Sequence, residues 1–293
     1  MRNRIGIEAL HEDFGARVTG VELSGDISRE DLGEIRAAID SYSVLCFPGQ
    51  DMSDDKQLAF TRLLGEPEPN HVTFGATGNV EYFGTIGNVL PDGSTRGNDD
   101  PRTRHQTGNE MWHSDSSFRE TPSYVSILHG YEVPDEGGRT EFVSQRPAYA
   151  RLPEDRKAAI DGLHVLHDYV FSRSKVAQVD PNHAASLPPV MHKLVKTNPG
   201  NGAKNYYVGS HARSIPGWSG IDGRALIDDL LAQATRPQDI YVHCWQPGDT
   251  VIWDNRCILH RGSGYDADRY RRRMRQTRVI GTEKGVIPGA QAA

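Results

Sequence analysis

Apolar and polar positions near the start of the chain predict strand, helix, strand and helix in that order. Residues 16–23 alternate between apolar and polar side chains, and residues 43–47 form a short apolar run, as strands do. Residues 29–42 and 54–64 place apolar side chains at helical spacing instead. A serine stands immediately before each of these two segments, in the position of an N-cap.

The rest of the chain is dominated by short strands. Residues 67–119 are rich in Gly, Asn, Asp, Thr and Pro, and so long an irregular stretch usually indicates a functional or mobile loop. After it we expect strands at 124–131, 140–143 and 163–170, a helical region at 144–163, a hairpin joining 194–197 to 205–208, a helix at 222–234, and strands at 240–245, 250–255, 257–262 and 273–281. This order favours a β-rich α+β fold, a jelly roll (double-stranded β-helix) with flanking helices.

Length and charge narrow the class of protein. We expect 293 residues to form one domain over 1–293, because β-rich enzymes of this size are often single domains. A net charge of -6 gives no reason to expect nucleic acid or an anionic membrane as a partner. The first residues lack the apolar segment of a secretory signal, and no apolar run is long enough to span a bilayer. We therefore expect a cytoplasmic protein, and we also expect a homo-oligomer.

The sharpest chemical feature is the sequence His113-Ser114-Asp115. In an extended segment, residues two apart point to the same side, so the imidazole and the carboxylate can bind one ion. Two histidines and one carboxylate form the facial triad of Fe(II) oxygenases, which leaves coordination positions open. His260 is the candidate for the second histidine, because it ends an apolar strand pattern and precedes a group of arginines.

The arginines after His260 suggest that an organic acid binds nearby. Arg271, Arg273 and Arg275 would share one face of a strand. A guanidinium group in a cavity is suited to bind a carboxylate such as the distal one of 2-oxoglutarate. The other interpretation is a solvated basic face, which we expect for most arginines of this group.

Three motifs agree in order and spacing with one family: WHSDSSF, PDEGGRTEF and WDNRCILHRG. The chain resembles the taurine dioxygenase and 2,4-dichlorophenoxyacetate dioxygenase family over nearly its whole length, and it is more similar to the aryloxyalkanoate branch. The resemblance implies a dioxygenase that uses Fe(II), 2-oxoglutarate and O2 to hydroxylate a small organic acid. An aryloxyacetate hydroxylated next to its ether oxygen would yield a phenol and glyoxylate, with release of succinate and CO2.

The resemblance also implies roles for individual residues. His113, Asp115 and His260 match the iron ligands. Thr140 and Arg275 match the groups that bind the far carboxylate of 2-oxoglutarate, with Arg271 as a helper and Trp253 as an aromatic residue near the metal. The presence of the Asp115 carboxylate favours hydroxylation over halogenation.

The residues that bind the substrate are less well defined by the motifs. Asn109 matches an asparagine that contacts substrate in the taurine enzyme. His71 matches its substrate-side histidine, and Phe74 stands where that enzyme has a tyrosine, which argues against copying sulfonate recognition. His211 follows a strand that resembles one bordering the substrate, and Arg213 lies beside it.

Three other functions stay open at this point. An alkyl sulfonate, a sulfate or another small organic acid would suit the same family. A zinc-dependent hydrolase could use the same three ligands, but it needs a general base beside the metal, and the sequence has no HExxH motif. A non-catalytic jelly-roll binding module would not need Asp115, Thr140 and Arg275 together.

Overall fold

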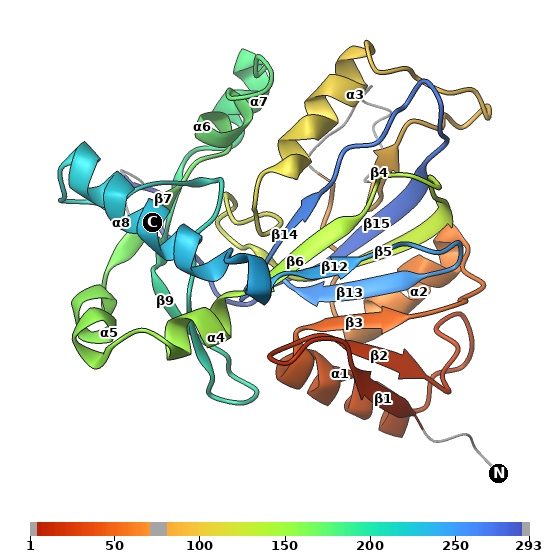
Figure 1. Ribbon diagram of the computed structural model, residues 1–293, viewed down its shortest axis with the longest axis horizontal. Helices are drawn as coiled ribbons and strands as arrows, with labels where there is room; N and C mark the ends of the chain where they lie inside the picture. Colours follow the sequence, from red (N-terminus) through yellow and green to blue (C-terminus); the bar gives the residue numbers. More distant parts are fainter. Residues whose placement is uncertain (1–4, 71–80, 289–293) are drawn as a thin grey trace.

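A large mixed sheet occupies the right-hand part of the molecule as seen in Figure 1. The computed structural model describes residues 5–70 and 81–288. Within these residues the sheet has seven strands, in the spatial order β1 (Gly6–Ala9), β2 (Ala16–Thr19), β3 (Val44–Phe47), β13 (Thr250–Asp254), β5 (Ser123–Glu132), β15 (Arg273–Ile280) and β4 (Gly84–Gly87). All neighbouring strands are antiparallel except β2 and β3, which run parallel.

A smaller antiparallel sheet packs against the large one. Its central strand β6 (Thr140–Ser144) pairs with β12 (Tyr241–His243) and with β14 (Ile258–Gly262). Apolar side chains from both sheets form one buried layer that includes Phe142, Trp253 and Met274. Two sheets facing each other across such a layer are the jelly-roll arrangement predicted from the sequence.

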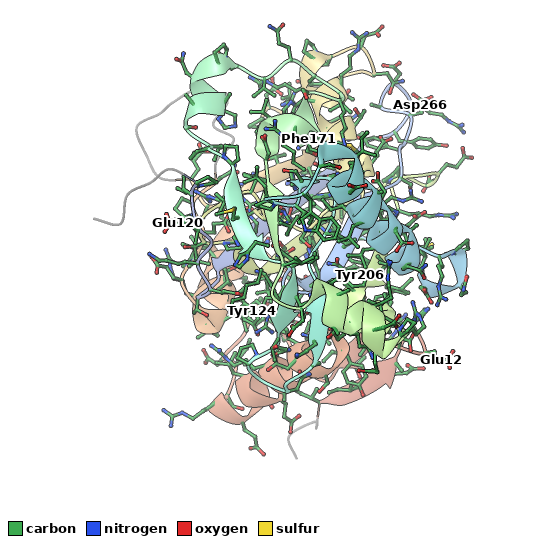
Figure 2. The ribbon with its side chains drawn as sticks, turned by 90° about the vertical axis from the view of Figure 1, so that its left-hand side faces the viewer. Glu12, Glu120, Tyr124, Phe171, Tyr206 and Asp266 are labelled. Carbon is green, nitrogen blue, oxygen red and sulfur yellow. The ribbon has the colours of Figure 1, made fainter. Side chains whose placement is uncertain are left out.

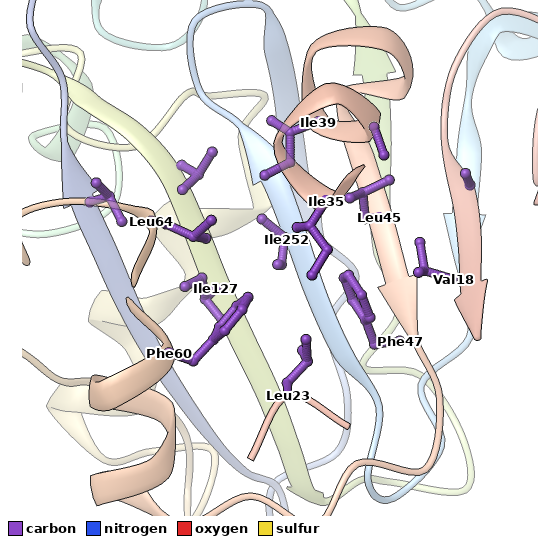
Figure 3. Packing of buried hydrophobic residues seen from close by; sticks show 14 of the residues in the cluster. Val18, Leu23, Ile35, Ile39, Leu45, Phe47, Phe60, Leu64, Ile127 and Ile252 are labelled. Carbon is purple, nitrogen blue, oxygen red and sulfur yellow. The ribbon is translucent and has the colours of Figure 1, made fainter. Parts of the chain in front are cut away.

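Two helices cover the outer face of the large sheet. α1 (Arg29–Tyr42) and α2 (Asp54–Leu64) have the bounds that the hydrophobic spacing predicts, and Ser28 and Ser53 cap their first turns. Figure 3 shows Ile35 and Phe60 of these helices pointing onto the strands, where they join the largest buried cluster. The apolar faces of these helices cover one face of the large sheet. Its other face packs against the smaller sheet.

A second group of elements lies beside the two sheets. β7 (His164–His167) pairs with β8 (Val190–Lys193) and β11 (Ala212–Ser214), and β9 (Val195–Thr197) forms a hairpin with β10 (Lys204–Tyr206). The helices here are α4 (Gln145–Ala150), α5 (Glu154–Ile160), α6 (Tyr169–Arg173), α7 (Pro181–Ala185), α8 (Gly220–Ala234) and the 3-10 turn η2 (Pro237–Asp239). Figure 2 views the molecule from this side, with α8 crossing the strands and Tyr206 labelled beneath it.

The irregular stretch before His113 contains elements that the sequence pattern did not predict. α3 (Pro101–Gln106) continues into the 3-10 turn η1 (Thr107–Glu110), which ends just before the histidine. Three predicted strands are too long: the first ends at Thr19, the one over 240–245 spans only Tyr241–His243, and the one over 163–170 ends at His167, where α6 follows. Among the described residues, no helix is both long and apolar enough to cross a membrane.

Candidate active site

Two backbone hydrogen bonds join His113 to His260. The N–H of His113 donates to the carbonyl of His260 at 3.1 Å, and the N–H of His260 donates back at 2.9 Å. This isolated antiparallel bridge places the two imidazoles side by side, with ring centroids 4.2 Å apart. The loop after η1 and strand β14, which are distant in the sequence, therefore meet at this point.

Asp115 completes a group of three possible metal ligands. Its Oδ1 lies 3.8 Å from Nε2 of His113, and its Oδ2 lies 3.9 Å from Nε2 of His260. One ligand atom from each residue lies within 4.8 Å of the other two. Two imidazoles and one carboxylate at this spacing have the composition of the facial triad that holds Fe(II).

Hydrogen bonds orient the donors of this triad. Nδ1 of His113 lies 2.7 Å from the carbonyl of Met111, which can only accept, so Nδ1 carries the proton and Nε2 keeps its lone pair. Oδ2 of Asp115 accepts from Ser126 at 2.6 Å and from Gln276 at 2.9 Å. The second oxygen, Oδ1, is therefore the better placed to bind an ion.

The charge states at the triad suit a divalent cation. Burial lowers the pKa of His260 to about 3, and the neighbouring His113 acts in the same direction. Burial alone would raise the pKa of Asp115, but the adjacent histidines and Arg278 outweigh it and lower this pKa to about 2. At neutral pH the imidazoles are uncharged and the carboxylate is ionised, as metal ligands must be.

The triad lies in the wall of a cavity of about 1270 Å³. Thr140 and Trp253 line the same cavity from the two facing sheets. Oγ1 of Thr140 accepts a hydrogen bond from Nε1 of Trp245 at 2.9 Å, and the Trp253 ring lies 4.6 Å from that of His260. The structure therefore brings the predicted metal ligands, Thr140 and Trp253 to one cavity.

The predicted substrate-side residues fall into two groups. Asn109 and His211 both line the cavity. The His211 ring packs against Phe118 at 4.8 Å and lies 6.3 Å from the His113 ring. His71 and Phe74 lie outside the described residues, and the structure gives no contact for them. Arg213 does not line the cavity and pairs with Asp168 at 2.9 Å.

The placement of Arg271 and Arg275 corrects the sequence prediction. Nε of Arg271 donates to Glu132 at 2.6 Å on the exposed side of the sheet, and Arg271 does not line the cavity. Arg275 lies at the cavity wall, but its guanidinium is paired with Asp54 at 2.6 Å. Within β15 the Arg275 side chain faces away from the buried Met274, and Arg271 precedes the strand with its guanidinium held by Glu132.

Arg272 is the residue that the sequence prediction missed. It is 7% exposed, lines the cavity, and its Nη2 reaches the carbonyl of Gly138, two residues before Thr140, at 3.3 Å. Its Nε has no hydrogen-bond partner among the described residues, and burial lowers the pKa of Arg272 to about 10. Such a cation needs an anion, so these residues fit the distal carboxylate of 2-oxoglutarate.

A signal for Arg272 was present in the sequence. Met274 is the one apolar residue in the sequence from Arg271 to Arg278, and it faces the core. Arg272, Gln276 and Arg278 share its parity and are all buried. Anchoring the strand pattern on Met274 rather than on the spacing from His260 would have identified the inward-facing arginines.

A second group of possible ligands, Cys46, His243 and Asp249, lies in the core. Both nitrogens of His243 already have partners, the Tyr241 hydroxyl at 3.0 Å and the Asp249 carboxylate at 3.1 Å. Burial raises the pKa of the Cys46 thiol to about 12, so it stays protonated. These contacts favour a hydrogen-bonded core network over a metal site.

Comparisons with known proteins agree with this geometry. The family model described as "Taurine catabolism dioxygenase TauD, TfdA family" matches residues 6–278. An alpha-ketoglutarate-dependent 2,4-dichlorophenoxyacetate dioxygenase of Cupriavidus pinatubonensis is 37% identical, over 92% of this chain and 95% of the relative. An (S)-phenoxypropionate/alpha-ketoglutarate-dioxygenase of Sphingobium herbicidovorans is 34% identical, over 94% of each chain.

The fold agrees with the same assignment. A crystal structure of AAD-2 in complex with Mn(II) and N-oxalylglycine superposes with a TM-score of 0.90 at 35% identity, covering 96% of this chain and 99% of AAD-2. The predictions of a jelly roll and of a dioxygenase are thereby confirmed. The chain belongs to the taurine catabolism dioxygenase TauD, TfdA family.

Proposed function

We propose that the protein is an Fe(II)- and 2-oxoglutarate-dependent dioxygenase that hydroxylates a small carboxylate-bearing ether of the aryloxyacetate type. The observation that carries this proposal is the convergence of His113, Asp115 and His260 within 4.8 Å on a cavity wall. The relatives named for 2,4-dichlorophenoxyacetate and phenoxypropionate support the substrate class.

The roles that we assign to the residues follow from their contacts. His113, Asp115 and His260 hold the iron, and Trp253 packs against the ring of His260. Arg272 and Thr140 bind the distal carboxylate of 2-oxoglutarate, because Arg272 is a buried cation without a carboxylate partner in the described part of the chain. Asn109 and His211 contact the substrate from the same cavity.

With iron and O2 bound, 2-oxoglutarate is oxidised to succinate and CO2, and the second oxygen atom is inserted into a C–H bond of the substrate. The protein orients the reacting carbon beside the triad and excludes water from it. When that carbon also bears the ether oxygen, the hydroxylated product is a hemiacetal. It collapses to a phenol and glyoxylate, with the hydroxyl proton passing to the leaving phenolate.

Other predictions about the protein stay proposals. We infer a cytoplasmic enzyme that forms a homo-oligomer, with a single domain over residues 1–293. Alkyl sulfates and sulfonates are the competing substrates. A zinc hydrolase is less well supported, because no Glu or His beyond the three ligands is hydrogen-bonded to the triad within the described residues.

A turnover screen tests the proposal. Purified protein with Fe(II), ascorbate and 2-oxoglutarate is mixed with O2 and with aryloxyacetates, aryloxypropionates, alkyl sulfates, alkyl sulfonates or cinnamate-like acids. We expect succinate to form in step with phenol from 2,4-dichlorophenoxyacetate. If succinate forms only with a sulfate or sulfonate, that compound class replaces aryloxyacetates as the proposed substrate. If the protein takes up iron but forms no succinate, the proposed dioxygenase activity is refuted.

A further inference from the structure

The cavity is also lined by a half-buried guanidinium, that of Arg173. Arg173 is the last residue of α6, and its Nη1 donates to the carbonyl of His105 in α3 at 2.8 Å. Figure 1 shows α6 and α3 as neighbouring helices from distant parts of the sequence. A Cβ atom on Gly108 would collide with this guanidinium, so it lies directly against the backbone of η1 beside Asn109.

Arg173 has no carboxylate partner among the described residues. Its side chain contacts the Tyr169 phenol, with Cζ 5.7 Å from the ring centroid, and burial raises the pKa of this phenol so that it stays uncharged. Burial lowers the pKa of Arg173, since a desolvated cation without a counter-ion is less stable. A guanidinium in this position favours the binding of an anion from the cavity.

Four other arginines that line the cavity are already neutralised. Arg275 pairs with Asp54 at 2.6 Å, and Arg278 pairs with the buried Glu68 at 3.2 Å. Arg104 and Arg273 pair with Asp99 and Glu132. Arg272 is thus a buried cation near Thr140, and Arg173 is a half-buried one near Asn109.

The position of Arg173 suits the primary substrate. The carboxylate of an aryloxyacetate is bonded to the carbon that is hydroxylated, so its binding group must lie close to the metal ligands. Arg173 lies against Gly108 of η1, five residues before His113, and the adjacent Ser172 donates a hydrogen bond to Ser210, next to His211, at 3.0 Å. α6 is also tied to the segment that carries His211, through the N–H of Asp168 and the carbonyl of His211 at 2.9 Å.

We propose that Arg173 binds the carboxylate of the primary substrate, beside Asn109 and His211, and so selects organic acids over neutral ethers. This inference rests on the proposed function, because it takes the primary substrate to be an anion that binds beside the triad. Arg272 then binds the carboxylate of 2-oxoglutarate, and Arg173 binds the carboxylate of the primary substrate.

The test measures binding without turnover. Protein loaded with Mn(II) and N-oxalylglycine is titrated calorimetrically with 2,4-dichlorophenoxyacetate and with its uncharged amide. We expect Arg173→Gln to weaken the acid roughly 10- to 100-fold, as the loss of a charged hydrogen bond does, and to leave the amide unchanged. Arg173→Lys should retain part of the preference for the acid.

The matched control is Arg213→Gln, which removes a neighbouring cation that does not line the cavity. It should bind the acid like the wild type. The inference fails if the wild type binds acid and amide equally, or if Arg173→Gln weakens both equally. These outcomes are read from binding alone, so they are distinct from a failure of the turnover screen, which would refute the proposed reaction instead.

Discussion

Gln276 donates a hydrogen bond from Nε2 to Oδ2 of Asp115 at 2.9 Å, while its Oε1 accepts one from Nη1 of Arg278 at 2.9 Å. Arg278 can only donate, so the amide of Gln276 must present its NH2 group to the carboxylate. Arg278 is held in turn by Glu68. A buried chain of polar groups therefore determines which oxygen of Asp115 faces the metal position.

Replacing Gln276 should weaken metal binding. Gln276→Leu removes one of the two donors to Oδ2 and leaves the carboxylate free to rotate, so we expect a roughly 10- to 100-fold loss of affinity for Co(II). The affinity is measured by absorption titration. Gln233→Leu on the exposed face of α8 is the control, and equal affinities for the two variants would contradict the positioning role.

Removing a metal ligand should abolish turnover. We expect Asp115→Ala and His113→Ala to form no succinate and to retain little iron after gel filtration, because two of three ligands do not hold the ion. Iron is measured by elemental analysis on the same samples. A variant that keeps both its iron and its turnover would remove that residue from the site.

Arg272 and Arg275 should differ in their effect on 2-oxoglutarate. We expect Arg272→Leu to raise the KM for 2-oxoglutarate roughly 10- to 100-fold, as the loss of a charged hydrogen bond does. Arg275→Leu breaks an ion pair with Asp54 at the cavity rim and should leave this KM near the wild-type value. The opposite order in steady-state kinetics would restore the assignment to Arg275.

The Gly108 position offers a second way to move Arg173. Gly108→Ala places a methyl group where the guanidinium lies, and the flexible end of the arginine can withdraw from it. We expect weaker binding of 2,4-dichlorophenoxyacetate to the Mn(II)-loaded protein and little change in thermal stability. Gly33→Ala on α1, where a methyl group meets no neighbour within 4 Å, should leave binding unchanged.

Stability should fall on acidification because of two buried histidines outside the active site. Burial lowers the pKa of His192 to about 3 and that of His129 to about 4. The unfolded state therefore binds more protons below about pH 6.5, and the free energy of unfolding should drop by about 1.4 kcal/mol per pH unit for each histidine. It should be constant above that pH.

Urea denaturation between pH 4.5 and 8 measures this slope. His192→Gln keeps a polar side chain that does not titrate in this range, so it should make the dependence shallower. A wild-type protein equally stable across the range would rule out this effect of burial.

Local sequence signals predicted the helices of the first part of the chain well. Ser28 and Ser53 accept backbone N–H groups at the first turns, and the bounds of α1 and α2 follow from these caps and from the apolar spacing. The strand predicted over 163–170 was wrong beyond His167 for the opposite reason. Val170 and the aromatic residues beside it favour a strand, but the Asp168 side chain caps a helix and Tyr169 is buried.

The candidate site was predictable only in part. Resemblance to one family named the three ligands, but no local pattern brings His260 to His113, because that contact depends on the whole jelly roll. Arg173 was not identified, since α6 is short and its polar neighbours give no periodic signal. Which side chains of the last strand face inward follows from the packing of Met274 in the core, and this packing is a tertiary contact.

The reciprocal hydrogen bonds between His113 and His260 have a consequence for biosynthesis. Two of the three ligands are translated long before the third, so a nascent chain that has emerged only as far as α8 lacks the last ligand and its strand. Iron can then bind only late, after the whole domain has been synthesised. The ion stabilises the fold that creates its own site, and a chelator should make the protein more prone to proteolysis.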